Sequence, residues 1–377
     1  MKSIHVHQQL LQQLIELGIP AEKPQLVNLA LLCQSLAFSS DCHLANLALN
    51  LPIEAQRESL IQRLRRSLKD ETYASETLYR PIRQHLFAHW SLREVCLVMD
   101  RTDIENRWSL LLLGASYKKR VLPLTWQMLP YGSSSAREQM ALLWKVERDL
   151  PPWARVHFYG DCEFRPVEVQ RLCRQFGWHY QVGVKSDTYF RVPPDQWQLL
   201  SSLGLQFGER RYLEGCYLSK QHDYGPLNVI ADWSKQQESP RYWALDLAAN
   251  LQAWRRGRKR YYIEPTFRDW KSSGFDLEGS KIEEEDRLEV LLLGMAMTSV
   301  WMVAVGDWLE GNGARPIIAP TEKDDYSVFR MGRDYVQRCR VMGWRVPIRF
   351  EVGRRAEGVE FPWSIGTGKE AALSAAA

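Results

Sequence analysis

The chain has 377 residues, of which 45% are hydrophobic, so it is long enough to bury a large core and to form two or three structural units. This composition excludes an unfolded tail or linker. The 49 Lys and Arg residues exceed the 45 Asp and Glu residues by only four, so net charge alone does not indicate an anionic partner. Local basic clusters such as 255–260 suit a phosphate backbone, although a solvated helix face is the commoner explanation for any one cluster.

Several classes of protein are not expected from the sequence. The seven cysteines are scattered without a CxxC pair, which predicts reduced thiols in a cytoplasmic protein. The N-terminus has no apolar core followed by a cleavage site, so no signal peptide is expected. The uncharged run 290–306 is shorter than a spanning helix of roughly 20 residues, and we predict a buried core helix there instead of a membrane span. No glycine-rich phosphate loop is present, so no nucleotide cofactor is expected.

Residues 1–90 carry the pattern of an all-helical unit. Leu10, Leu14 and Leu17 recur at helical spacing. A later stretch, Ile53–Leu68, mixes apolar positions with arginines and is suited to laying a basic helix face on DNA. We therefore predict a helical DNA-binding domain over residues 1–90.

From Glu94 onward, short apolar runs alternate with amphipathic stretches. The predicted elements are, in chain order, strands at 95–99, 108–115 and 121–129, a helix at 136–150, a strand at 156–159, a helix at 167–176 and a strand at 179–185. This is the order of a ribonuclease-H-like α/β fold, with a mixed five-stranded sheet flanked by helices. In that fold the first and fourth strands deliver Asp100 and Asp161 to one end of the sheet.

The rest of the chain is divided by changes in its residue pattern. Residues 186–241 are rich in short β-like pieces and are predicted to form a β-rich insertion. The catalytic core then has a first part at 91–185 and a second part at 242–310, which is largely helical. A C-terminal region follows at 311–377, with a disordered tail predicted from Gly366.

Three carboxylates in this pattern can carry chemistry. Asp100 and Asp161 each follow a predicted buried strand, and Glu264 lies in a predicted helix. An aspartate at a strand end is more often a turn or cap residue when considered alone. Phosphodiester cleavage by two metal ions, however, needs carboxylates that hold two Mg²⁺ ions, and Mg²⁺ prefers oxygen ligands. Asp100, Asp161 and Glu264 together would supply such ligands, although they do not form one continuous sequence motif.

Their neighbourhoods carry a family resemblance. Arg260, Glu264 and Lys271 are spaced by three and six intervening residues, the segment 98–102 is an apolar strand leading into D-x-T, and the segment 158–164 is a strand leading into an aspartate and an aromatic. These features resemble the DDE transposases of bacterial insertion sequences, specifically the large IS-four-like group with its Tyr-Arg-Glu-Lys signature.

The chain departs from the pattern of that group at three positions. Gly257 stands where the signature has tyrosine, and Cys162 and Glu163 replace the Arg and Gly that usually follow the second aspartate. The resemblance covers roughly residues 95–302. These departures put the roles of the replaced side chains in doubt but leave the carboxylates in place.

The signature residues have a physical rationale on a helix. On one continuous helix, Arg260, Glu264 and Lys271 would project from one face toward the metal site. Pro265 fits the first turn of a helix better than its interior, so a kink or break is expected near Arg260.

The resemblance implies a metal site and a DNA partner. Asp100, Asp161 and Glu264 would bind two Mg²⁺ ions, for which Mn²⁺ can substitute. Arg260 and Lys271 would grip phosphates of the transposon end, the neighbouring basic residues would extend that grip, and an aromatic residue would stack on a flipped base. The DNA-binding candidates are therefore Arg260, Lys271, Arg255, Arg256, Arg258, Lys259, Trp233 and Trp243.

The implied activity is cut-and-paste transposition through a hairpin intermediate, with a homodimer acting on paired ends of double-stranded DNA and then on target DNA. Two alternatives remain open at this stage. One is a nuclease of the same fold that cleaves without joining, and the other is an inactive DNA-binding protein descended from a transposase.

Overall fold

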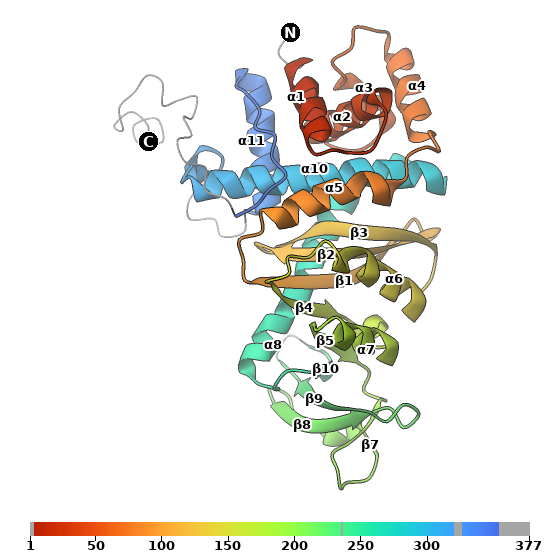
Figure 1. The fold of residues 1–377 in the computed structure, drawn as a ribbon, viewed down its shortest axis with the longest axis vertical. Coiled ribbons are helices and arrows are strands. Elements are labelled where there is room, and N and C mark those ends of the chain that lie inside the picture. Colours follow the sequence, from red (N-terminus) through yellow and green to blue (C-terminus); the bar gives the residue numbers. More distant parts are fainter. Residues whose placement is uncertain (1–3, 235–236, 320–325, 354–377) are drawn as a thin grey trace.

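The computed structural model describes residues 4–234, 237–319 and 326–353. The predicted tail from Gly366 lies outside these residues. Figure 1 shows a mixed α/β molecule in which helices form one end and a long twisted sheet runs to the other.

The N-terminal region is helical, which confirms the prediction from its periodicity. Its helices are α1 (Ile4–Glu16), α2 (Lys23–Phe38), α3 (Leu44–Leu49), α4 (Arg57–Leu68) and α5 (Ser75–Ala88). The apolar positions of α1 form a stripe, because Leu10 and Leu14 are fully buried while their polar neighbours face outward. Pro81 lies inside α5 without ending it.

One mixed sheet organises the rest of the chain. Its strands are β1 (Glu94–Ile104), β2 (Trp108–Tyr117), β3 (Arg120–Pro130), β4 (Arg155–Gly160), β5 (His179–Val184), β6 (Tyr189–Arg191), β7 (Gln198–Leu199), β8 (Arg210–Leu218), β9 (Tyr224–Asp232) and β10 (Arg241–Leu245). They lie in the order β3-β2-β1-β4-β5-β10-β9-β8-β6-β7. β1 pairs with β4 in parallel and with β2 antiparallel, and β4 pairs with β5 in parallel. This first half is consistent with a ribonuclease-H-like transposase fold.

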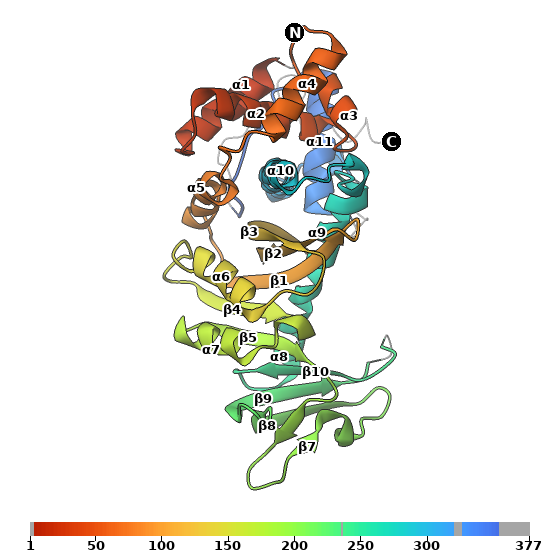
Figure 2. The same cartoon turned by 90° about the vertical axis from the view of Figure 1, so that its right-hand side faces the viewer.

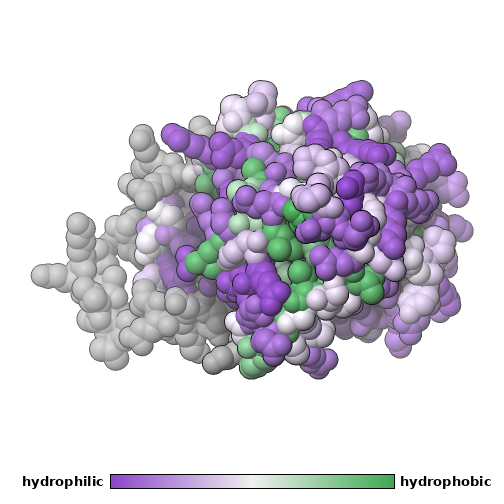
Figure 3. All heavy atoms as spheres, turned by 90° about the horizontal axis from the view of Figure 1, so that it is seen from below, coloured by the Kyte–Doolittle hydropathy of each residue, from purple (hydrophilic) through white to green (hydrophobic). Residues whose placement is uncertain are grey.

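The prediction of a five-stranded sheet was wrong in extent, because the described residues form one ten-stranded sheet. β10 pairs antiparallel with both β5 and β9, so the strands between 186 and 241 continue the sheet. Pairing in this way satisfies the backbone groups that β5 would otherwise expose at an edge. Seen from the β7 end, the surface is mostly hydrophilic, with hydrophobic residues in small groups (Figure 3).

Helices cover the sheet and carry the chain back across it. They are α6 (Ala136–Glu147), α7 (Val167–Gln175), α8 (Leu251–Gly257), α9 (Ile263–Arg268), α10 (Glu285–Gly311) and α11 (Val328–Met342). Short 3₁₀ segments are η1 (Cys162–Phe164), η2 (Leu200–Leu203), η3 (Arg258–Tyr262), η5 (Glu278–Ser280) and η6 (Arg315–Ile317), and η4 (Asp269–Ser273) is a π-helical turn.

The apolar run 290–306 lies in α10, which is long and apolar enough to cross a membrane by length and composition alone. In the structure 94% of its most apolar 18-residue window is buried within the protein. Figure 2 looks along α10 and shows it encircled by the N-terminal helices, α11 and β3. The predicted buried core helix is confirmed.

Candidate active site

The pairing of β1 with β4 positions the two aspartates. Val98 lies opposite Tyr159 in the parallel register, and Asp100 and Asp161 each follow two residues later. β1 continues to Ile104, with Asp100 opposite Leu112 of β2, so the prediction that a strand ends before Asp100 was wrong. The pairing of β1 with β4 stops at Val98 and Tyr159, however, so both carboxylates lie just beyond the last paired residues of the two parallel strands.

Local hydrogen bonds orient both side chains. Asp100 Oδ1 accepts from the Arg101 N–H at 2.8 Å, and Asp161 Oδ1 accepts from the Glu163 N–H at 2.7 Å as it caps η1. Gly183 on β5 lets this turn lie close, because a Cβ there would stand 2.8 Å from the Cys162 nitrogen.

Glu264 and Arg260 complete the cluster from the helical segment that crosses beneath the sheet. Arg260 Nη1 lies 3.3 Å from Asp100 Oδ2, and Nη2 lies 3.5 Å from Glu264 Oε1. Burial raises the pKa of Asp100 to about 6; Arg260 opposes this shift, whereas the charges of Asp161 and Glu264 add to it. The three predicted carboxylates are therefore close enough to act on one another electrostatically.

The donor chemistry of this cluster suits a hard divalent cation, since every candidate ligand is a carboxylate oxygen. Within the described residues, however, no three His, Cys, Asp or Glu side chains are arranged to hold one metal ion together. Arg260 lies between Asp100 and Glu264, and the Glu264 side chain is 55% exposed and so has room to move. The donor atoms fit a hard divalent ion, and holding one would require the three carboxylates to come closer together than they lie in this structure.

The signature residues do not share one continuous α-helix. The segment passes from the 3₁₀ helix η3 through α9 to the π-helical η4, and Pro265 lies in the first turn of α9, where a missing N–H costs nothing. Arg260 and Glu264 meet across this junction. Lys271 instead donates to the Asp103 carbonyl at 2.8 Å and pairs with Glu278 at 2.6 Å.

The basic cluster 255–260 divides between two directions. Arg255 and Arg258 are exposed. Arg256 turns back toward Glu94 at 4.0 Å, and Lys259 lies 3.2 Å from the Cys96 sulfur at the start of β1. Only the first pair is therefore placed on the surface where a DNA backbone can reach it.

Two cavities meet at Trp243. One, here the Asp161 cleft, has a volume of about 510 Å³ and is lined by residues that include Asp161, Arg260, Tyr261 and Trp243. The other, here the aromatic cavity, has a volume of about 1060 Å³ and includes Trp243, Trp254, Arg255, Arg258 and Tyr261. The first thus opens beside the catalytic candidates, and the second extends it along α8.

Trp233, the other aromatic candidate, lines neither cavity. Its indole N–H donates to the Gln237 carbonyl at 3.2 Å, and its ring packs against Phe207. The sequence offers Tyr261, Tyr262 and Trp254 as residues that could take the role of the missing signature tyrosine. Of these, Tyr261 accepts from Arg241 through its hydroxyl at 2.8 Å, and its ring lies 4.5 Å from the Arg260 guanidinium.

The glycine at the signature tyrosine position has a structural reason. A Cβ on Gly257 would lie 2.2 Å from Nε2 of Gln181, a buried residue of β5. Any side chain at 257 therefore requires Gln181 to move. The amide of Gln181 occupies the space where the signature tyrosine would begin.

Two acidic residues near Asp100 are accounted for by other contacts. The Asp103 carboxylate binds the Arg101 guanidinium and accepts from Ser109 Oγ at 2.7 Å. Glu105 is exposed in the β1–β2 turn. Neither belongs to the cluster around Arg260.

The sheet and its carboxylate cluster together define a mixed α/β protein whose site is suited to phosphoryl transfer. The model of the Transposase DDE domain family matches residues 93–301, which is more than half of the 377-residue chain, and the chain belongs to that family. DDE enzymes transfer phosphoryl groups and generally use divalent metal ions.

Among solved structures, one similar chain is the piggyBac transposase in a cryo-EM synaptic complex with hairpin DNA. The match has a TM-score of 0.45 and 9% sequence identity, and it covers 89% of this chain and 79% of that chain. No curated protein matches.

Proposed function

We propose that this protein is a DNA transposase of the IS-four-like group that cleaves the ends of its own element and joins them to target DNA. The observation that carries the proposal is the convergence of Asp100, Asp161 and Glu264 around Arg260 at one edge of the sheet. Three residues from distant parts of the chain meet in a family whose members transfer phosphoryl groups.

The three carboxylates would hold two Mg²⁺ ions, or Mn²⁺ in their place. Bound there, such ions make an attacking oxygen more nucleophilic and stabilise the charge on a leaving oxygen. The protein's own contribution is to hold the phosphate. Arg260, only 15% exposed, is placed to exchange a carboxylate partner for a phosphate oxygen.

The chemistry balances without an external energy source. A water oxygen attacks phosphorus, the bond from phosphorus to the 3′ oxygen of the element breaks, and that oxygen takes a proton. In joining, the freed 3′ hydroxyl attacks a target phosphorus, loses its proton, and displaces a target 3′ oxygen. Each step exchanges one phosphorus–oxygen bond for another, which agrees with the absence of a nucleotide-binding loop from the sequence.

The aromatic cavity suits the end of the element. Arg255 and Arg258 are exposed cations for the backbone, and Trp243, Trp254 and Tyr261 present rings on which an unpaired base can stack. A base leaves the duplex when a strand folds back into a hairpin, so this cavity supports a hairpin intermediate. Action as a homodimer on paired ends, in the bacterial cytoplasm, belongs to the same proposal.

The test is an excision assay. Purified protein is incubated with a plasmid that carries its gene and flanking DNA, with Mg²⁺ or Mn²⁺, beside Asp161→Ala and a matched control, Asp195→Ala, which changes an exposed aspartate between β6 and β7. Excision by the wild type and the control but not by Asp161→Ala supports the proposal. Cleavage without any joined product would indicate a nuclease instead.

A second candidate is an inactive DNA-binding descendant of a transposase, and one observation favours it. Gly257 stands at the signature tyrosine position, and an inactive enzyme would tolerate that change. Specific binding to the flanking DNA, with no cleavage under either metal, would support this candidate.

A further inference from the structure

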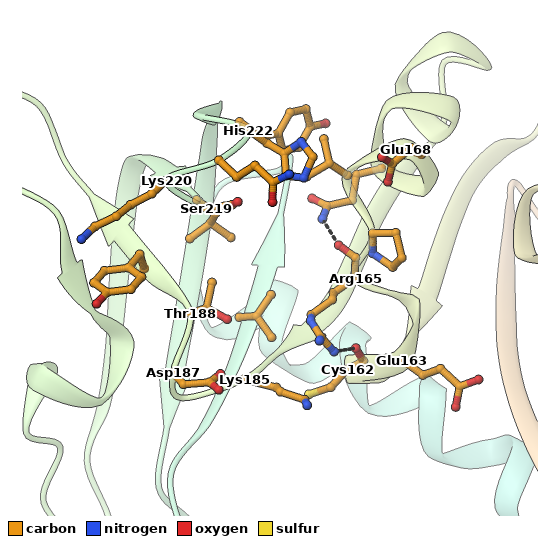
Figure 4. Close-up of a pocket in the computed structure, with 18 of the residues that line it drawn as sticks. Cys162, Glu163, Arg165, Glu168, Lys185, Asp187, Thr188, Ser219, Lys220 and His222 are labelled. Carbon is orange, nitrogen blue, oxygen red and sulfur yellow. Dashed lines mark hydrogen bonds between the residues drawn. The ribbon is translucent and has the colours of Figure 1, made fainter. Parts of the chain in front are cut away.

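A second large cavity opens on the other side of Asp161. Its volume is about 1010 Å³, and it lies between the turn after β4 and the hairpin that joins β8 to β9. This cavity is called the hairpin cavity here, after the β8–β9 hairpin of the protein. Figure 4 shows Arg165 and Lys185 reaching toward Cys162 in it, with Lys220 and His222 on the side of the β8–β9 hairpin.

The cavities form a continuous path. The hairpin cavity and the Asp161 cleft share Cys162, Val184, Lys185 and Asp187 as lining residues. The Asp161 cleft and the aromatic cavity share Arg241, Trp243 and Tyr261. The catalytic aspartate therefore lies between two larger cavities.

The lining of the hairpin cavity suits a phosphate backbone. In the described part of the chain Lys185 has no ion-pair partner, and the Lys220 ammonium lies 3.7 Å from the Tyr189 ring centre without a carboxylate. Glu163 points away, since it is bound by Ser134 at 2.7 and 2.6 Å and by Arg101 at 3.2 Å.

Three carboxylates, Glu163, Glu168 and Asp187, also line the hairpin cavity, so charge alone does not define the site. Hydroxyls of Ser133, Thr188 and Ser219 supply neutral donors beside the cations. Contacts of this kind position a strand without reading its bases. The aromatic cavity offers the rings of Trp243, Trp254 and Tyr261 to a base. The two tyrosines of the hairpin cavity are less available, because Lys220 covers Tyr189 and Tyr224 is buried.

The bonds to the reacting phosphorus indicate which DNA segment each of the two cavities beside Asp161 holds. In the first cleavage the reacting phosphorus joins the element, through a 3′ oxygen, to flanking DNA held through a 5′ oxygen. In the joining step the element's 3′ oxygen approaches a target phosphorus that keeps its own 5′-linked strand. In both reactions the 5′-linked strand is a DNA segment other than the element, whereas in the hairpin step the 5′-linked strand is the element's own second strand.

We propose that, in the first cleavage and in the joining step, the hairpin cavity holds the DNA attached to the reacting phosphorus through its 5′ oxygen: the donor flank during cleavage and the target strand during joining. This inference rests on the proposed function and on the placement of the element's end in the aromatic cavity. One cavity then serves two DNA segments of unrelated sequence, which agrees with a lining that does not read bases.

Disulfide trapping tests the position of the DNA directly. His222→Cys is mixed with end-containing duplexes that carry a thiol tether on a single phosphate, either inside the element or in the flank. Lys145→Cys, an exposed position of α6, is the matched control, and the unmodified chain gives the background of the partly exposed Cys162.

We expect His222→Cys to trap flank tethers at least tenfold more than element tethers, whereas the control traps neither. Equal trapping, preferred trapping of the element, or no trapping above background would overturn the inference. Trapping reads position on bound DNA, so it remains informative even if the wild type fails the excision assay and the proposed function is lost.

Charge reversal provides an independent readout. With pre-cut ends and limiting target DNA, Lys220→Glu should lower joining about tenfold while binding of the end duplex stays unchanged, and Lys145→Glu should change neither. An equal loss of end binding in Lys220→Glu would place the element, not the target, in the hairpin cavity.

Discussion

Two arginines of this protein, Arg83 and Arg260, each lie between two carboxylates, yet their surroundings differ. Arg83 on α5 donates to Asp149 at 2.8 Å, to Glu76 at 2.7 Å and to the Leu124 carbonyl at 2.9 Å. Its side chain is fully buried. Every donor direction of this guanidinium is committed, so the cluster ties α5 to the sheet and to the end of α6.

Arg260 is held more loosely. Its two contacts, with Asp100 and Glu264, are 3.3 and 3.5 Å long, and Glu264 is more than half exposed. Long contacts at a solvent-accessible edge are weak, and their partners can be exchanged. We call the Arg83 group the saturated cluster, because its contacts are short and every nitrogen has a partner, and the Arg260 group the loose cluster, because its contacts are long. The comparison indicates that an arginine of the first kind stabilises the fold, whereas one of the second kind is available to a ligand.

The largest expected effect is at the loose cluster, where a substitution should lower activity without lowering stability. Asp100→Asn should lower excision by about a thousandfold or more, equivalent to ~4 kcal/mol in the barrier, because it removes a metal-binding charge. Its free energy of unfolding should not fall, since a buried charge is also removed. Excision assays and urea unfolding measure the two quantities. Asp103→Asn is the control, and an equal loss of excision there would refute the assignment.

The next effect concerns the saturated cluster. Arg83→Leu should lower the free energy of unfolding by about 3 kcal/mol or more, because Asp149, only 1% exposed, loses its buried partner. Arg260→Leu should lower the free energy of unfolding less than Arg83→Leu does, because the contacts of Arg260 are longer and one of its partners, Glu264, is 55% exposed. Chemical unfolding of both variants tests the comparison. Similar losses of unfolding free energy in the two variants would show that Arg260 has a structural role.

Much of the fold was predictable because local patterns decide it. The run 95–99 is apolar for its whole length, and the run 156–159 is apolar except for His157, as is typical of buried parallel strands. Asp100 follows the first run directly, and Asp161 follows the second after Gly160. The continuation of the sheet through β10 was not predictable, because the pairing of β10 with β5 depends on backbone contacts between residues about 60 positions apart. No local periodicity reports such a contact.

The proximity of Arg260 and Glu264 was predictable from the sequence, but the contacts of the other candidate residues were not. Spacing identified Arg260 and Glu264, which meet as expected. The same spacing suggested that Lys271 would join them, but helix geometry changes twice along the segment and rotates Lys271 toward Asp103. The side of the helix on which each arginine of the cluster lies depends on that same geometry, which composition does not reveal.

Glu289, near the saturated cluster, shows how burial changes the pKa of a carboxylate that is not paired with an arginine among the described residues. Burial raises the pKa of Glu289, on α10, to about 7. The folded protein therefore keeps a proton at pH values where the unfolded chain, with a pKa of about 4.3, has lost it. The contribution of Glu289 to stability is fully present below about pH 4 and is lost as the pH rises through 7.

Glu289→Gln should remove this dependence. Its free energy of unfolding should exceed that of the wild type by about 3 to 4 kcal/mol at pH 8 and match it near pH 4. Unfolding curves across this range provide the measurement. Glu54→Gln, at an exposed position, should leave the pH profile unchanged. Parallel profiles of wild type and Glu289→Gln would mean that Glu289 ionises normally in the folded protein.

The smallest effect tests the loose cluster without any DNA. Arg260 places a positive charge between Asp100 and Glu264, so a divalent cation must compete with it. Arg260→Gln should therefore bind Mn²⁺ about three- to tenfold more tightly than the wild type, measured by electron paramagnetic resonance of free Mn²⁺. Arg258→Gln removes a neighbouring exposed charge that contacts neither carboxylate and should change the affinity less. If both variants bind Mn²⁺ equally well, the effect comes from net charge alone, and the loose contacts of Arg260 do not control access to the carboxylates.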